Sequence, residues 1–260
     1  MKDILDEIIE AKQQRLIEQK NAVGIDFLQQ SLSEVSPTRS MRASLEKSSS
    51  GIIAEFKRKS PSKGWIKEDA NIESIIPSYE KNGASALSIL TDTPFFGGNI
   101  KDIKTARPLS NLPILRKDFI IDEYQLYQAR SIGADAVLLI AAALTIDNCN
   151  YLAKVAHELE LEVLLEIHQE KELEYLNEYI DMVGVNNRNL GTFHTDIENS
   201  FRLASQLPEN ILLVSESGIS SPETIIKLRE VGFKGFLIGE TFMKTENPGE
   251  ALGTFINKLI

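Results

Sequence analysis

The segment Gly-Ile-Ile-Ala-Glu-Phe-Lys-Arg, residues 51–58, combines the periodicity of a β-strand with two charges on one face. Side chains alternate along a strand, so the isoleucine, alanine and phenylalanine at positions 52, 54 and 56 share one face, and Glu55 and Lys57 share the other. A central parallel strand is buried on both faces and is normally apolar throughout. If the apolar face meets helices, both charges point into the mouth of a barrel.

Seven further apolar segments follow this one along the chain. With the first, they occupy residues 51–58, 84–91, 112–119, 134–142, 162–168, 182–187, 211–217 and 235–239. Helical patterns lie between and after them, for example at residues 122–132, 146–159, 222–231 and 248–259. A doubly wound sheet also alternates in this way, but the count of eight favours the closed α/β architecture, a (βα)8 TIM barrel.

Composition limits the function classes. The chain has 260 residues, and α/β barrels of about 250 residues form one domain, so residues 1–260 are expected to be a single domain. The formal net charge of −10 argues against a nucleic-acid partner. No apolar run reaches the roughly 18 residues of a membrane span, and the acidic N-terminus lacks a signal-peptide core. We therefore expect a cytoplasmic protein without a membrane partner. A monomer is compatible with this sequence, which does not by itself fix the oligomeric state.

Residues 1–48 precede the first strand and form a separate element. Apolar residues from Ile4 to Ile17 fall near helical spacing, and a second helical stretch covers residues 40–47. Two interpretations remain open from the periodicity. The extension either packs under or outside the barrel, or forms a flap near the active-site mouth.

Polar side chains gather at the ends of several predicted strands. Lys117 ends the third strand, Glu166 the fifth, Asn186 and Arg188 the sixth, and Glu216 the seventh. Each could be a salt bridge at the rim, but several unpaired buried charges are costly, so stability alone rarely explains such a cluster. Active sites of barrel enzymes lie at the C-terminal ends of the strands. We expect the active site there.

Glycines directly follow the last two strands, in Ser217-Gly218 and Gly239-Glu240. Barrels often hold a substrate phosphate at this place, where backbone N–H groups approach the anion closely. Ordinary turns would also contain such glycines. Because the Glu240 carboxylate would repel phosphate, we expect its N–H to face the ligand and its side chain to point away. The single cysteine, Cys149, and the three histidines show no metal-ligand spacing.

Four segments carry a family resemblance. They are Ile-Ala-Glu-Phe-Lys-Arg-Lys-Ser-Pro-Ser at 53–62, Pro-Ile-Leu-Arg-Lys-Asp-Phe at 113–119, Gly-Val-Asn-Asn-Arg-Asn-Leu at 184–190 and Glu-Ser-Gly-Ile at 216–219. In this order and spacing they resemble the indole-3-glycerol-phosphate synthases of tryptophan biosynthesis, over essentially the whole chain. One departure is Asn99, where the family usually has serine after the second strand. Another is Glu240, where some members have serine.

The resemblance implies a (βα)8 barrel whose N-terminal extension lies near the active-site mouth. It implies a carboxy-lyase without metal or organic cofactor. The substrate implied is 1-(2-carboxyphenylamino)-1-deoxyribulose 5-phosphate, and the products are indole-3-glycerol phosphate, carbon dioxide and water.

The resemblance also suggests roles. Lys117 is the expected general acid and Glu166 the general base, with Glu55 and Lys57 as further catalytic groups. The expected substrate-binding residues are Ser60, Pro61, Phe96, Phe119, Asn186, Arg188, Leu190 and Glu216. The expected phosphate-binding residues are Ser217, Gly218, Gly239 and Glu240.

Two alternatives remain. A phosphoribosylanthranilate isomerase-like barrel would need an acid–base pair of Cys and Asp, whereas Cys149 falls in a helical pattern and the first strand carries Glu55 and Lys57. A non-catalytic barrel that binds a phosphosugar, as a sensor or scaffold, would bind its ligand tightly without turnover.

Overall fold

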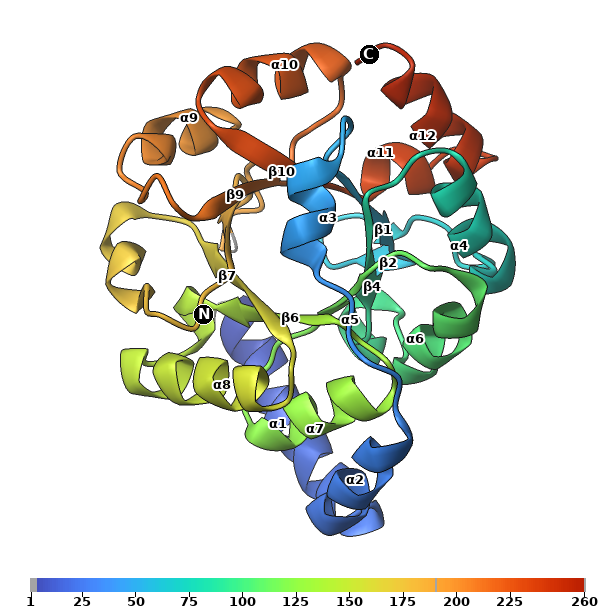
Figure 1. The fold of residues 1–260 in the computed structure, drawn as a ribbon, viewed down its shortest axis with the longest axis vertical. Coiled ribbons are helices and arrows are strands. Elements are labelled where there is room, and N and C mark those ends of the chain that lie inside the picture. The colour runs from blue at the N-terminus through green and yellow to red at the C-terminus, as the bar shows by residue number, and fades with distance from the viewer. Residues whose placement is uncertain (1–3, 190, 260) are drawn as a thin grey trace.

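The computed structural model describes residues 4–189 and 191–259, in which eight parallel strands close into a barrel surrounded by helices (Figure 1). Around the barrel the strand order is β1, β10, β9, β8, β7, β6, β5 and β4, so barrel strands that follow one another in the chain pair with one another, and the last, β10, closes the barrel on β1. The barrel strands are β1 (Ile52–Phe56), β4 (Ala86–Leu90), β5 (Ile114–Lys117), β6 (Ala136–Ile140), β7 (Glu162–Ile167), β8 (Met182–Asn186), β9 (Leu212–Glu216) and β10 (Phe233–Ile238). The predicted TIM barrel is confirmed.

The α-helices are α1 (Ile4–Ala22), α2 (Ile25–Ser31), α3 (Met41–Lys47), α4 (Ile72–Lys81), α5 (Thr93–Phe96), α6 (Ile100–Ala106), α7 (Glu123–Ser131), α8 (Ile146–Glu158), α9 (Glu198–Ala204), α10 (Pro222–Glu230), α11 (Glu240–Met243) and α12 (Pro248–Ile256). Short 3-10 helices are η1 (Leu32–Glu34), η2 (Arg107–Leu109), η3 (Ala141–Ala143) and η4 (Glu170–Tyr175). The crossover between β7 and β8 therefore contains only a 3-10 helix. A small hairpin of β2 (Lys59–Ser60) and β3 (Gly64–Trp65), which the sequence patterns did not indicate, follows β1.

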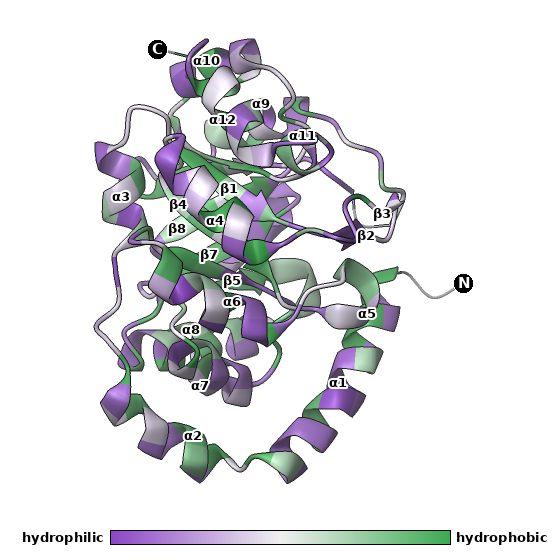
Figure 2. Cartoon of the chain, turned by 90° about the vertical axis from the view of Figure 1, so that its right-hand side faces the viewer, coloured by the Kyte–Doolittle hydropathy of each residue, from purple (hydrophilic) through white to green (hydrophobic). Residues whose placement is uncertain are grey.

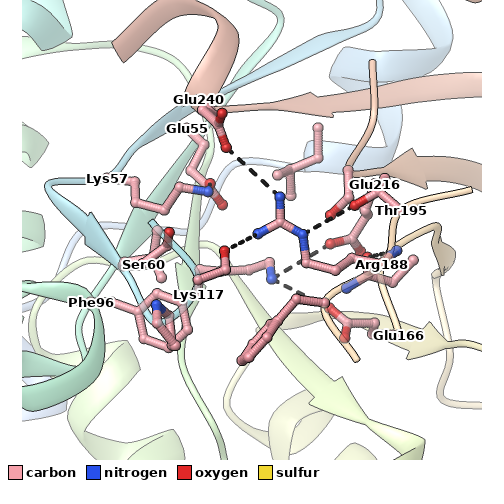
Figure 3. A pocket seen from close by; sticks show the side chains of 18 of the residues that line it. Glu55, Lys57, Ser60, Phe96, Lys117, Glu166, Arg188, Thr195, Glu216 and Glu240 are labelled. Carbon is pink, nitrogen blue, oxygen red and sulfur yellow. Dashed lines mark hydrogen bonds and ion pairs between the residues drawn. The ribbon is translucent and has the colours of Figure 1, made fainter. Parts of the chain in front are cut away.

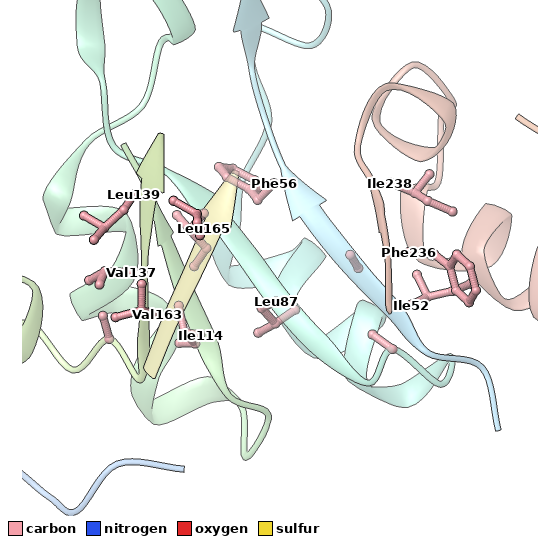
Figure 4. Close-up of a cluster of buried hydrophobic side chains, with 14 of the residues drawn as sticks. Ile52, Phe56, Leu87, Ile114, Val137, Leu139, Val163, Leu165, Phe236 and Ile238 are labelled. Carbon is pink, nitrogen blue, oxygen red and sulfur yellow. The ribbon is translucent and has the colours of Figure 1, made fainter. Parts of the chain in front are cut away.

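The strands bury two apolar layers, one on each face. Outward-facing side chains, such as Phe56, Leu165 and Phe236, pack between the strands and the surrounding helices (Figure 4). Inward-facing side chains, such as Ile53 and Leu164, fill the barrel. The predicted alternation along the first strand is confirmed, because Glu55 shares the inward face of Ile53. Burial of these apolar layers contributes about 25 cal/mol per Å² to the stability of the barrel. The stable barrel in turn fixes the positions of the inward-facing charges.

The N-terminal extension covers both ends of the barrel. Ile4, Leu5 and Ile8 of α1 line the cavity at the C-terminal ends of the strands, whereas Met41 and Leu45 of α3 pack into the inner apolar layer at the other end. Figure 2 shows α3 on the side of the barrel opposite to β2, β3 and α5. Both interpretations of the extension therefore apply, each to a different helix.

A buried ammonium ties α1 to the barrel. Lys12 Nζ lies 2.8 Å from Asp92 Oδ2 and 2.6 Å from Asp118 Oδ1. Arg15 also contacts Asp92, and Arg116 also contacts Asp118. Burial would raise the pKa of Asp118, but Lys12 and Arg116 outweigh it and hold that pKa at about 2. The two carboxylates belong to segments that enter the active site, since Asp92 precedes α5 and Asp118 follows Lys117.

Replacing Lys12 with methionine is expected to lower the free energy of unfolding by about 3 kcal/mol, the lower end of the range for removing one partner of a buried ion pair. Arg15 and Arg116 still neutralise the carboxylates, which keeps the loss from being larger. Lys20→Met is the matched control, because Lys20 pairs with Asp122 at an exposed site, where such a pair contributes less than about 1 kcal/mol. Denaturant unfolding of both variants measures the difference, and equal stabilities would contradict the prediction.

The same pair gives stability a pH dependence. Asp118 has a folded pKa of about 2, below its ordinary value of 3.8. Its contribution is therefore fully present above the ordinary value and is lost as pH falls through about 2. The stability difference between the wild type and Lys12→Met should narrow over this interval.

Candidate active site

A cavity of about 460 Å³ opens at the C-terminal ends of the barrel strands. It collects the residues that the sequence predicted for the site. Those that line it are Glu55, Lys57, Ser60, Pro61, Phe96, Lys117, Phe119, Glu166, Asn186, Arg188, Glu216, Ser217, Gly218, Gly239 and Glu240. The remaining predicted residue, Leu190, lies outside the described residues. Strands β1, β5, β7, β8 and β9 thus bring Glu55, Lys117, Glu166, Asn186 and Glu216 to one place.

Lys117, at the end of β5, stands between two carboxylates. Its Nζ is 3.3 Å from Glu166 Oε2 on β7 and 3.5 Å from Glu216 Oε2 on β9 (Figure 3). Burial would lower the pKa of Lys117, but Glu166, Glu216 and Glu55 outweigh it and raise the pKa. The side chain is therefore an ammonium at neutral pH, held at the cavity by Glu166 and Glu216.

The two carboxylates differ in charge state. Burial raises the pKa of Glu216 to about 8, reinforced by the negative charges of Glu166 and Glu55 and only partly opposed by Lys117. Burial also acts on Glu166, but Lys117 and His168 outweigh it and lower its pKa. The two carboxyl groups that face the Lys117 ammonium thus have pKa values shifted in opposite directions. Glu166 is the ionised one at neutral pH and is available as a base.

A second ion pair lies on β1 and just beyond it. Lys57 Nζ is 2.7 Å from Glu55 Oε1. Burial would raise the pKa of Glu55, and Lys57 together with Lys117 holds it below its ordinary value. Glu55 is 3% exposed, so its charge depends on these two ammoniums. A substrate anion that attracted Lys57 would leave Glu55 a stronger base.

Two glycines make room for the carboxylates. A Cβ on Gly184 would lie 2.1 Å from Glu216 Oε1, and a Cβ on Gly239 would lie 2.4 Å from Glu55 Oε1. Both distances are far inside van der Waals contact. Gly239, which the sequence assigned to phosphate approach alone, therefore also accommodates Glu55. Any larger residue at either position would displace a charged group of the site.

Replacing Gly184 with alanine is expected to lower kcat about 10²-fold, the cost of misplacing a reacting group by about 1 Å. The added methyl group forces Glu216 aside and with it the ammonium of Lys117. Gly24→Ala is the control, because nothing lies within 4 Å of the Cβ that it adds. Steady-state kinetics of the two variants tests this, and an unchanged kcat for Gly184→Ala would contradict it.

Arg188 crosses the other side of the cavity. Its guanidinium donates to Ser62 Oγ at 3.2 Å and Thr195 Oγ1 at 3.3 Å, and it lies 3.7 Å from the Glu240 carboxylate (Figure 3). The Glu240 side chain does not point away from the site as the sequence analysis expected. It faces Arg188, and the ion pair offsets the repulsion that motivated that expectation. Ser217 has a φ of +66°, a strained conformation that is typical of functional turns in non-glycine residues.

Apolar side chains form the remaining wall. The rings of Phe96 and Phe119 are 6.0 Å apart between centroids, and Ile4, Leu5 and Ile8 of α1 lie on the same cavity. A flat aromatic ligand could pack against these apolar side chains, next to Lys117. The sequence analysis found the two phenylalanines but not the leader residues, because no local pattern tells which strand ends a leader helix will reach.

The sequence analysis also missed His168. Its Nε2 lies 3.4 Å from Glu166 Oε1 and its Nδ1 lies 3.7 Å from Glu172 Oε2. The sequence showed only that His168 lacks the spacing of a metal ligand. The available signal was its position two residues after Glu166, which puts both on one face of the strand.

Within residues 4–189 and 191–259, no group of three or more His, Cys, Asp or Glu side chains could hold a metal ion.

Comparison with known proteins settles the family. The model of the indole-3-glycerol phosphate synthase family matches residues 5–255. The chain belongs to the indole-3-glycerol phosphate synthase family. The indole-3-glycerol phosphate synthase of Bacteroides thetaiotaomicron is 65% identical over 259 residues and is covered in full, as is this chain. That of Neisseria meningitidis is 46% identical, covering 97% of this chain and 99% of its own length.

Solved structures share the fold. The tryptophan synthase alpha-subunit of Pyrococcus furiosus superposes with a TM-score of 0.61 at 14% identity, over 81% of this chain and 97% of its own. The 3-hexulose-6-phosphate synthase of Salmonella typhimurium gives a TM-score of 0.61 at 14% identity, over 81% of this chain and 100% of its own. At this identity the likeness concerns the barrel alone.

Membership of the indole-3-glycerol phosphate synthase family accounts for the features that the isomerase alternative does not. Cys149 lies on α8, buried in the outer apolar layer, and does not line the cavity that holds the inward-facing charges. Asn99, which replaces the usual serine of the family, caps α6 by accepting a hydrogen bond from the Lys101 N–H at 2.9 Å. That departure therefore affects only the start of a helix.

Among the described residues, no helix has the length and apolar character of a membrane span.

Proposed function

We propose that this cavity converts 1-(2-carboxyphenylamino)-1-deoxyribulose 5-phosphate into indole-3-glycerol phosphate, carbon dioxide and water. The observation that carries the proposal is the ammonium of Lys117, held between Glu166 and Glu216 beside a wall of Phe96 and Phe119. Ring closure needs an acid next to a carbonyl oxygen and an aromatic ring stacked against the carbon that it attacks. In this cavity Lys117 is the acid, and Phe96 and Phe119 form a surface against which the aromatic ring of the substrate can pack.

Lys117 acts as the general acid of ring closure. The ring carbon that bears the carboxylate attacks the C2' carbonyl carbon, and the carbonyl oxygen takes a proton from Lys117 to become a hydroxyl. The developing alkoxide is a stronger base than the lysine amine, so the transfer is favourable even though the neighbouring carboxylates raise the pKa of Lys117. Carbon dioxide then leaves, and the electron pair of its bond restores the aromatic ring.

Glu166 acts as the base of dehydration. It removes a proton from the C1' carbon while the hydroxyl leaves as water, protonated by an ammonium. Lys57 is placed to share this acid role, because it lies on the same mouth and contacts Glu55 at 2.7 Å. Glu55 orients Lys57, and Glu216 orients Lys117.

The far side of the cavity binds the anionic ends of the substrate. Arg188 is placed to meet the carboxylate or a hydroxyl by paired donors, with Ser60, Pro61 and Asn186 around it. The turn of Ser217 and Gly218 and the Gly239–Glu240 segment present backbone to the phosphate. The ligand is thus a phosphorylated small molecule, and α1 completes the mouth of a single-domain enzyme that needs no cofactor or partner chain.

The decisive test is to mix the purified protein with the substrate in metal-free buffer and follow indole fluorescence together with carbon dioxide. Catalytic appearance of both supports the proposal. Tight binding of the substrate without turnover would favour a phosphosugar-binding sensor or scaffold instead. A folded protein that neither binds nor converts this substrate would refute the substrate assignment.

A further inference from the structure

His168 connects the proposed base to a second cavity. The two oxygens of Glu166 face different partners: Oε2 lies 3.3 Å from Lys117 Nζ, and Oε1 lies 3.4 Å from His168 Nε2. On the far side of the imidazole, Nδ1 lies 3.7 Å from Glu172 Oε2. Four titratable groups therefore form a row, from Lys117 through Glu166 and His168 to Glu172.

The second cavity, of about 720 Å³, lies between the end of β7 and the segment that joins β8 to α9. His168 lines it, although it does not line the first cavity. His194, Asp196 and Arg202 also line it and are exposed, so this cavity meets solvent. The His168 side chain thus stands between the buried carboxylate of Glu166 and the second cavity, with both of its ring nitrogens covered by protein atoms.

The surroundings of His168 favour its charged form. Burial alone would lower the pKa of His168, but Glu172, Glu166 and Glu216 outweigh it, so the pKa is raised. Those carboxylates come from η4, β7 and β9, and the neighbouring α9 contributes Asn199, whose amide donates to the His168 carbonyl oxygen at 3.0 Å. The His168 backbone N–H donates to Glu172 Oε2 at 2.6 Å. Glu172 therefore fixes the residue and stabilises an imidazolium.

The proposed reaction takes up one proton in each turnover. Ring closure gives one proton to the carbonyl oxygen, and dehydration gives a second to the leaving hydroxyl. Glu166 recovers one, from the C1' carbon. Because the substrate carboxylate leaves as neutral carbon dioxide, one further proton must come from water to recharge the ammonium groups. That proton has to reach ammonium groups such as Lys117, whose side chain is only 15% exposed.

We propose that His168, which lies between Glu166 and Glu172, passes this proton to Glu166 Oε1. Glu166 then delivers a proton from Oε2 to the amine of Lys117, and His168 regains its proton from water of the second cavity when its ring turns toward that cavity. The inference rests on the proposed function, and His168 acts through Glu166 rather than on the substrate. It predicts that His168 matters between turnovers and not in the first chemical step.

The test compares two kinetic regimes in His168→Gln. With enzyme in excess, carbon dioxide release in a single turnover should keep the wild-type rate, because the resting ammonium already holds its proton. With substrate in excess, kcat should fall about tenfold, less than the roughly 10²–10⁴-fold attributed to a direct acid or base. Added imidazole buffer at constant pH should raise kcat of the variant, by supplying protons from the second cavity, and should leave the wild type unchanged.

Two further variants keep the outcome decisive. His157→Gln removes an imidazole that pairs with Asp181 at a part-exposed site and should behave as wild type in both regimes. Glu172→Gln keeps an acceptor for the His168 N–H but removes the charge, and it should slow kcat in the same selective way if His168→Gln fails to fold. Wild-type rates in both regimes, or equal slowing of both without buffer rescue, would overturn the relay. A wild-type enzyme without turnover would instead overturn the proposed function.

Discussion

Replacing Lys117 with methionine is expected to lower kcat about 10²–10⁴-fold, the range attributed to general acid catalysis. Methionine fills most of the volume of the lysine side chain but carries no proton to the carbonyl oxygen. Substrate affinity should change little, because Arg188, the Ser217–Gly218 turn and the two phenylalanines remain in place. Single-turnover carbon dioxide release and the substrate Kd measure the two effects separately.

Lys154→Met is the matched control for this variant. Lys154 lies on α8 with a largely exposed side chain, 3.9 Å from Glu158, so its loss removes one positive charge without touching the cavity. In Lys117→Met, Glu166 and Glu216 lose their shared cation, and they are expected to take up protons rather than unfold the barrel. Near-normal turnover in a folded Lys117→Met protein would eliminate Lys117 as the acid.

Replacing Glu166 with glutamine is expected to separate the two halves of the reaction. Ring closure and decarboxylation need an acid, so carbon dioxide should still appear. Dehydration needs a base, so indole formation should fall about 10²–10⁴-fold and a hydroxylated, non-fluorescent intermediate should accumulate. Parallel detection of carbon dioxide and of indole fluorescence gives the ratio of the two rates.

Glu170→Gln is the control, because Glu170 is an exposed residue at the start of η4. Glu55→Gln is the informative comparison, since Glu55 is the other ionised carboxylate of the mouth. If Glu55→Gln releases carbon dioxide without indole and Glu166→Gln does not, the base is Glu55. Equal loss of carbon dioxide and indole in Glu166→Gln would contradict its assignment to dehydration.

The barrel was predictable because each strand obeys one rule locally. Outward positions such as Phe56 and Leu165 must be apolar to meet helices, so an inward charge such as Glu55 or Glu166 stands out against the strand pattern. The same parity placed Lys117 correctly. The charges at the other strand ends obey the same rule, and their side chains meet only because the barrel closes.

What the sequence did not reveal depends on contacts between distant segments. Lys12 reads as one charge of an amphipathic helix, and its buried partners Asp92 and Asp118 lie far along the chain. The direction of the Glu240 side chain depended on Arg188, which arrives from another strand. His168 was visible by parity with Glu166, but an imidazole matters here only through Glu172 and the second cavity.

Because α3 closes one end of the barrel, the substrate cavity does not continue through it. Inward side chains such as Leu164 and Met182 fill the barrel below the charges, and Met41 and Leu45 cover its far end. Among the described residues, this packing fills the far end of the barrel, so a ligand as large as the substrate enters and leaves at the end that α1 lines. The product must therefore leave before the next substrate molecule binds, and slow release of indole-3-glycerol phosphate would inhibit the enzyme competitively.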